Sequence, residues 1–127
     1  MTVTAYRNTA TGIPLVPSAF TVVVQLRVPN TGNFVVSGRI TATNPTTTPQ
    51  TINTEMTTLD GATVLDEALV TVPAGANANM VCVTLQGFLS PSSAGQNEIV
   101  DLRCASNCTA NSCSLIATSV DALSGSL

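Results

Sequence analysis

The chain has 127 residues, of which 9% are charged and 3% aromatic, and it carries a net charge of −3 with no histidine, lysine or tryptophan. Without histidine, the Ser/His/Asp and Cys/His nucleophile systems and histidine metal sites are unavailable, so we do not expect an enzyme. Four arginines cannot form the basic patch that holds a phosphate backbone, so nucleic-acid binding is not expected either. The longest unbroken apolar run covers residues 80–83, far below the roughly 20 residues that span a bilayer, so no membrane segment is expected.

The scarcity of charge also limits what the surface can be made of. Much of it must consist of Thr, Ser, Asn and Gln, or else be covered by another subunit. The first residues lack the basic start and the apolar stretch of a signal peptide. We therefore expect synthesis in a cytosol and release without a cleaved leader, as for a virion protein on lysis.

Residues 1–19 contain three residues that discourage regular structure, Gly12, Pro14 and Pro17. The apolar side chains of this segment are too few to form a core of their own. Such a segment becomes ordered only when a neighbour covers it. We therefore expect an amino-terminal arm over residues 1–19, which docks onto a capsid lattice or an adjacent subunit, and a separate domain over residues 20–127. The candidate docking side chains are Tyr6, Ile13, Leu15 and Val16.

Two segments after the arm alternate apolar and polar residues with the period of two that is typical of a strand with one buried face. In residues 20–28 the even positions are apolar, and only Val23 breaks the pattern. Residues 34–42 repeat the pattern, with Val35 as the exception. The sequence Pro-Asn-Thr-Gly at 29–32 supplies a turn between them. Because both segments have one apolar face, we expect them to pair antiparallel.

Five further strands are predicted by weaker versions of the same alternation, at residues 52–58, 63–72, 81–89, 100–104 and 116–120. Turn or loop signals separate them, among them Asp60-Gly61, residues 73–75, residues 90–95 and a Cys/Asn/Ser-rich stretch up to about Ser112. A helix over residues 65–69 is the competing interpretation, but five residues are too few to stand alone. Seven or eight short strands without a helix-length pattern predict an all-β fold, either an antiparallel two-sheet β-sandwich or a jelly roll.

The order of these segments resembles the small bacterial and phage proteins with a C1q/TNF-like β-jelly roll. The likeness lies above all in the Pro-x-x-Gly-x-Phe-Val-Val sequence at 29–36 and in the Val-Pro-Ala-Gly turn at 72–75, which precedes an apolar strand. It covers roughly residues 20–123. The resemblance implies a homotrimer in which each protomer packs the edge of its sandwich against the inner sheet of the next. It also implies a role in presentation or adhesion rather than catalysis.

The four cysteines are Cys82, Cys104, Cys108 and Cys113. The last three are spaced C-x3-C-x4-C, which matches no C-x2-C zinc pattern, so neither a metal nor another cofactor is expected. Disulfides are predicted if the protein matures outside the cell, and the local choices are Cys108 with Cys113 or Cys104 with Cys113. Three pairings of four cysteines are possible, and the sequence does not choose among them. Free buried thiols are the alternative.

The carboxylates give no sign of a catalytic or metal site. Asp66 and Glu67 are neighbours on a predicted strand and point to opposite faces, which makes them a poor general acid/base pair. A loop calcium site at Asp60 or Asp66 would rest on no motif. We expect solvated or subunit-facing carboxylates at Asp60, Asp66, Glu67, Glu98 and Asp101.

Two functional hypotheses follow from these patterns. The first is a structural protein of a virion surface, such as a bacteriophage capsid decoration or cement protein, which forms homotrimers and contacts capsid or other virion proteins. The second is a receptor- or glycan-binding trimeric head on a phage fibre or on a bacterial or spore surface, in which small polar loops at 31–33, 46–50 and 90–97 hold a sugar by hydrogen bonds.

Overall fold

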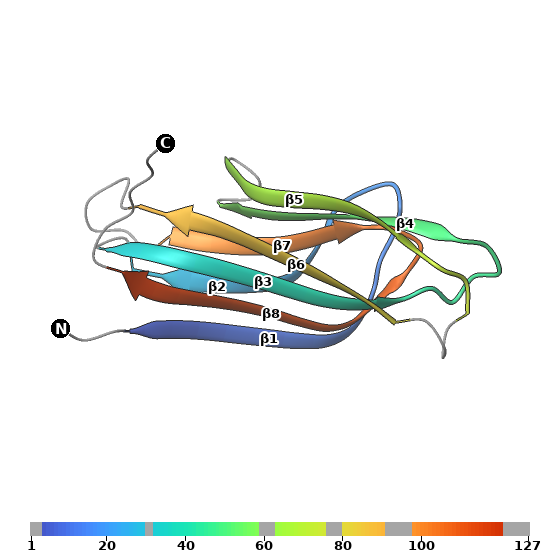
Figure 1. Cartoon of the computed structure of the whole chain (residues 1–127), viewed down its shortest axis with the longest axis horizontal. Coiled ribbons are helices and arrows are strands. Elements are labelled where there is room, and N and C mark those ends of the chain that lie inside the picture. The colour runs from blue at the N-terminus through green and yellow to red at the C-terminus, as the bar shows by residue number, and fades with distance from the viewer. Residues whose placement is uncertain (1–3, 30–31, 59–62, 76–79, 91–97, 121–127) are drawn as a thin grey trace, which may run out of the picture.

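The computed structural model describes residues 4–29, 32–58, 63–75, 80–90 and 98–120. These residues form eight strands, which pair antiparallel in two four-stranded sheets of a β-sandwich (Figure 1). The prediction of an all-β, antiparallel two-sheet fold is confirmed. No helix in this part of the chain is long and apolar enough to cross a membrane. Sheet A has the strand order β1 (Ala5–Pro14), β8 (Thr109–Val120), β3 (Asn33–Thr43) and β6 (Met80–Leu89). Sheet B has the order β2 (Thr21–Val28), β7 (Glu98–Ala105), β4 (Gln50–Thr58) and β5 (Thr63–Val72).

The pairing of strands follows one rule along the chain. Strands of the first half pair with strands of the second half in reversed order, β1 with β8, β2 with β7, β3 with β6 and β4 with β5. The prediction that residues 20–28 and 34–42 pair with each other is therefore wrong, because β2 lies in sheet B and β3 in sheet A. Both strands bury one face in the same core, but from opposite sheets. A shared apolar face thus specifies which layer a strand faces and not which strand it pairs with.

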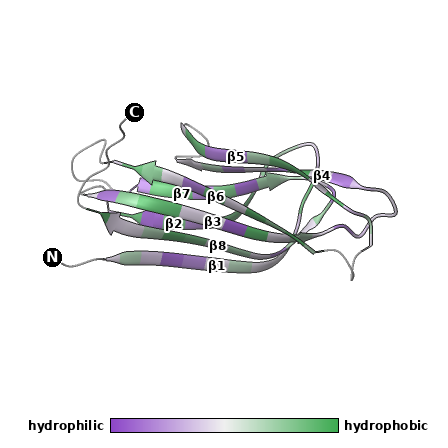
Figure 2. Ribbon diagram, viewed as in Figure 1, coloured by the Kyte–Doolittle hydropathy of each residue, from purple (hydrophilic) through white to green (hydrophobic). Residues whose placement is uncertain are grey.

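The core lies between the two sheets, where their apolar faces meet. On β3 the predicted parity is confirmed, since Phe34, Val36 and Ile40 are at most 4% exposed. Hydrophobic and hydrophilic stretches follow one another along this strand (Figure 2). Burial of such side chains contributes about 25 cal/mol for each Å² of apolar surface removed from water. The largest fully buried side chains are Ile40, Ile52, Met56, Leu102 and Leu115.

The beginning of β2 departs from the predicted parity. The register with β7 shifts between Val22 and Val24, so that Val23 is 3% exposed whereas Val22 is 41% exposed. An irregularity of this kind gives one strand an extra residue and reverses the faces of the residues before it. Val23, which breaks the alternation in the sequence, is therefore a core residue. Phe20, expected inside, is 36% exposed.

The segment expected to be an irregular arm contains a regular strand. β1 pairs with β8 over its whole length, from Ala5 opposite Thr118 to Pro14 opposite Thr109. Gly12 takes a φ of 63°, a left-handed conformation that glycine adopts without steric cost. The expectation that residues 1–19 lack regular structure is therefore wrong. The neighbour that orders this segment is β8 of the same chain.

The Cys/Asn/Ser-rich stretch expected to be a loop up to Ser112 is largely strand, because β8 begins at Thr109. Its polar residues find partners on β3. The hydroxyls of Thr41 and Ser112 are 2.8 Å apart, and Asn111 Nδ2 donates to Thr43 Oγ1 at 3.0 Å. Hydroxyl and amide pairs across strands stabilise a sheet as apolar pairs do. The polar composition of this stretch therefore led to the wrong prediction of a loop where β8 begins.

Among the residues that the structure describes, side-chain hydrogen bonds join the two sheets on both open sides of the sandwich. On one side, Asn8 of β1 donates from Nδ2 to the carbonyl oxygen of Gln25 on β2 at 2.7 Å. On the other side, the backbone N–H of Gln86 on β6 donates to Asp66 Oδ2 on β5 at 2.9 Å. Edge strands otherwise expose unpaired backbone groups. These bonds therefore satisfy backbone groups of edge strands and hold the sheets together.

Candidate functional site: a polar hollow on sheet A

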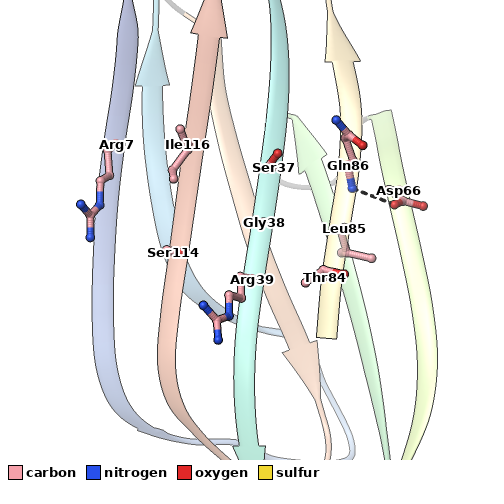
Figure 3. A pocket seen from close by; sticks show the side chains of 10 residues that line it. All are labelled: Arg7, Ser37, Gly38, Arg39, Asp66, Thr84, Leu85, Gln86, Ser114 and Ile116. Carbon is pink, nitrogen blue, oxygen red and sulfur yellow. Dashed lines mark hydrogen bonds between the residues drawn. The ribbon is translucent and has the colours of Figure 1, made fainter. Parts of the chain in front are cut away.

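A hollow of about 740 Å³ lies on the outer face of sheet A (Figure 3). Side chains of β1, β8, β3 and β6 form its floor, and Asp66 of β5 stands at one end. The strand register aligns these residues in rows that run across the sheet. One row consists of Arg7, Ile116, Ser37 and Gln86, and the next contains Ser114, Arg39 and Thr84. Clefts of this size are large enough for a small-molecule ligand.

Charge is divided unequally between the two sheets. The four strands of sheet A contain two arginines, Arg7 and Arg39, and no carboxylate. All five carboxylates of the described residues lie on strands of sheet B. Both arginines of sheet A line the hollow, and neither forms an ion pair with any residue that the structure describes. The hollow therefore has a positive floor in a protein of net negative charge.

Three hydrogen bonds fix the charged groups of the hollow, one made by Arg39 and two made by Asp66. Arg39 donates from Nε to Cys82 Sγ at 3.3 Å, which leaves its terminal nitrogens for other partners. Asp66 accepts the backbone N–H of Gln86 through Oδ2 and that of Glu67 through Oδ1. A carboxylate offers about four lone-pair positions, so Asp66 keeps acceptor capacity toward the hollow. The site thus offers donors on the β1–β3 side and an acceptor at the β5 end (Figure 3).

Two carboxylates of sheet B, Glu55 and Asp101, form side-chain hydrogen bonds within that sheet. Glu55 Oε1 accepts from Arg103 Nη2 at 2.7 Å and Nε at 3.1 Å, and the Arg103 guanidinium lies 4.5 Å from the centre of the Phe20 ring. Asp101 is fully buried and accepts from Gln25 Nε2 at 2.7 Å. The expectation of solvated or subunit-facing carboxylates is therefore wrong for Asp101. It is also wrong for Glu98, which is 8% exposed, whereas Asp60 lies outside the described residues.

The four cysteines, all within the described residues, have free thiols. Cys104 and Cys113 lie on opposite sheets and are buried in the core, as is Cys108, while Cys82 is exposed. Burial raises the pKa of Cys104 to about 12, against a smaller lowering by its hydrogen bond with Thr54, and burial raises the pKa of Cys113 to about 11. These two thiols stay protonated at neutral pH. A disulfide stays a prediction, which a thiol count on the unfolded chain tests.

The residues expected to dock the arm lie mostly against the protein itself. Tyr6 meets the ring of Phe34 edge-on at 5.9 Å, Ile13 packs against the core, and Leu15 is 8% exposed within the core. Val16 alone among the four is largely exposed, at 48%. The structure therefore assigns three of the four predicted docking side chains to internal packing.

Of the loops expected to hold a sugar, only residues 46–50 are described in full. Thr46, Thr48 and Gln50 form hydrogen bonds with one another. Buried Asn44 also holds this loop, because its Nδ2 donates to the carbonyl oxygens of Thr48 and Val72. Residues 30–31 and 91–97 lie outside the described part of the chain. Among the described residues no group of three His, Cys, Asp or Glu side chains could hold a metal ion.

The sequence did not predict the hollow, because its pattern placed Arg7 in an amino-terminal arm and not in a sheet. The parity of β3 did indicate that Arg39 faces outward, and it does. The position of β1 beside β8 was needed to bring Arg7 to the same face. A comparison with protein-family models gave no match, and a search of curated proteins gave none either.

Proposed function

We propose that the sandwich is a C1q/TNF-like jelly roll and that the protein is a non-enzymatic structural component of a virion surface, assembled as a homotrimer. The strand order supports the first part of the proposal. A jelly roll can be described as a long antiparallel hairpin rolled into two sheets, so that strands of its two halves pair in reversed order. The orders β1-β8-β3-β6 and β2-β7-β4-β5 fit that description.

The observation that carries the assembly proposal is a set of large apolar side chains exposed on the edge strands β5 and β6. They are Val64 and Leu69 on β5 and Met80 and Phe88 on β6, with exposed fractions between 46% and 71%. Covering such side chains with a partner removes apolar surface from water and favours association. An edge that packs against a neighbouring copy is also what the family resemblance implies. These side chains therefore support a subunit contact that involves β5 and β6.

Light scattering and native mass spectrometry test the trimer. The wild-type chain should have three times the monomer mass at micromolar concentration. Leu69→Asp combined with Phe88→Asp should give monomers, because two charges would be buried unpaired in the contact. Val16→Asp is the matched control, since Val16 is also exposed but lies between β1 and β2. A stable wild-type monomer, or dissociation by the control alone, would refute this contact.

The place of the protein on a virion is tested with particles from the native source. If the proposal is correct, the chain co-purifies with particles at fixed stoichiometry, and electron micrographs show it on their surface. Val16 is the predicted docking residue that stays exposed, so Val16→Asp should reduce attachment while it leaves the trimer intact. A protein that is absent from purified particles would exclude the virion role.

The alternative function is a receptor- or glycan-binding head. It is favoured by the hollow on sheet A, whose serine, threonine and glutamine groups suit the hydroxyls of a sugar. A glycan array separates the two functions. Specific binding without attachment to particles would favour the head, and attachment without glycan binding would favour the structural role.

A further inference from the structure

We infer that the hollow on sheet A binds a saccharide that carries a carboxylate group, such as a uronic or sialic acid. The inference rests on the alternative function proposed above and specifies its ligand. It is carried by the charge, the neutral polar groups and the position of the single acidic residue within the hollow.

The two arginines define the charge of the ligand. Arg7 and Arg39 stand two strands apart with β8 between them, which corresponds to about 10 Å across the sheet. Both side chains are exposed and long enough to approach a group placed over Ser114 and Ile116. Guanidinium groups bind carboxylates through paired N–H···O bonds. No carboxylate of sheet A competes for them.

The remaining residues define the rest of the ligand. Ser37, Ser114, Thr84 and Gln86 are neutral groups that both donate and accept hydrogen bonds, as sugar hydroxyls do. Ile116 is 38% exposed in the middle of the floor and offers an apolar surface to the C–H face of a ring. A neutral polar floor with one apolar residue fits a saccharide better than it fits an apolar ligand.

Asp66 restricts the ligand further. Its carboxylate stands at the β5 end of the hollow, held by the N–H groups of Gln86 and Glu67. A polyphosphate or another ligand with charge along its whole length would meet this carboxylate and be repelled. A sugar acid can place its one carboxylate at the arginines and a hydroxyl at Asp66. The arrangement thus favours one negative charge at one end of a hydroxylated ligand.

The test uses the full chain, with its oligomeric state measured in parallel, and two matched ligand pairs. These are sialyllactose with lactose, and galacturonic acid with its methyl ester. Titration followed by calorimetry or NMR should show binding of the acid of at least one pair and at least tenfold weaker binding of its neutral counterpart. Added salt should weaken the binding of the acid, because the arginines are exposed.

Matched substitutions locate the site. Arg7→Gln and Arg39→Gln should each weaken binding about tenfold or more, since a hydrogen bond to a charged group is lost. Arg27→Gln removes the same charge from β2, on the other sheet, and should leave binding unchanged. The inference is overturned if neither acid binds, if acid and neutral ligands bind equally, or if Arg27→Gln weakens binding as much as the other two. Dissociation of the trimer by Arg7→Gln or Arg39→Gln would also overturn it, while leaving the trimer proposal intact.

Discussion

Phe34 connects the core to the amino-terminal strand, because its ring is 4% exposed and meets Tyr6 of β1 edge-on. Phe34→Ala should therefore lower the free energy of unfolding by about 3 to 5 kcal/mol, from the lost transfer energy and the cavity left behind. Arg39→Ala, on the outer face of the same strand, should change it by less than about 1 kcal/mol. Urea unfolding of both variants measures the difference. Equal losses would mean that the register of β3 is displaced by one residue.

Thr57 carries a buried hydroxyl group that lowers the stability of the fold. Its hydroxyl oxygen is buried and has no hydrogen-bond partner among the described residues. An unpaired buried hydroxyl costs free energy that an apolar group of the same shape does not. Thr57→Val should therefore raise the free energy of unfolding by about 1 kcal/mol. Thr54→Val, which removes a hydroxyl that is hydrogen-bonded to Cys104, is the control and should not raise the free energy of unfolding.

The buried thiols of Cys104 and Cys113 make the free energy of unfolding depend on pH in the alkaline range. In the unfolded chain they ionise near pH 9, whereas burial raises the pKa of Cys104 to about 12 and that of Cys113 to about 11. Above pH 9 the unfolded chain loses protons that the folded chain keeps, so stability falls as pH rises. Unfolding curves should be independent of these thiols below about pH 8 and show a decline between pH 9 and 11. The variant Cys104→Ala with Cys113→Ala should start less stable but decline less steeply.

Among the strands, β1 differs most clearly from the sequence prediction, which placed its residues in an irregular arm. Deletion of residues 2–17 removes the partner of β8 along one edge, together with the buried side chain of Leu15. We expect a loss of more than about 3 kcal/mol in the free energy of unfolding. Thermal and urea unfolding measure it, and deletion of residues 2 and 3 alone, which precede the strand, should cost much less. Unchanged melting of the longer deletion would show that sheet A does not need β1.

Strands with an apolar face were predictable, and strands stabilised by polar pairs were not. β3 and β6 place most of their large apolar residues on one face, so parity alone identified most of their buried residues. β1 and the first part of β8 hold short or polar residues whose partners lie more than 60 positions away in sequence, as Thr41 and Ser112 do. Local pattern contains no information about such partners. The hollow could not be predicted for the same reason, because Arg7 and Arg39 reach one face only through the pairing of β1 and β3 with β8.

At the scale of the whole molecule, the pairing of distant strands predicts slow folding. β1 pairs with β8 and β2 with β7, so long loops must close before these contacts form. Refolding from urea should therefore take milliseconds to seconds, as for other sandwiches of non-local topology. Stopped-flow measurements can follow far-UV circular dichroism and the fluorescence of Tyr6, the single tyrosine. A dominant microsecond phase with native amplitude would contradict this expectation.

The position of β8 between two other strands of sheet A also determines when the protein can fold during translation. β8 lies between β1 and β3, and of the eight strands that the structure describes it is the last to leave the ribosome. Until then β1 has no partner in sheet A, and β3 can pair only with β6. The nascent chain therefore exposes strand edges and the apolar inner faces of sheet A until β8 has left the ribosome. An efficient producer of this protein must protect those edges until then, and the first eighty residues released alone should aggregate rather than form a stable half.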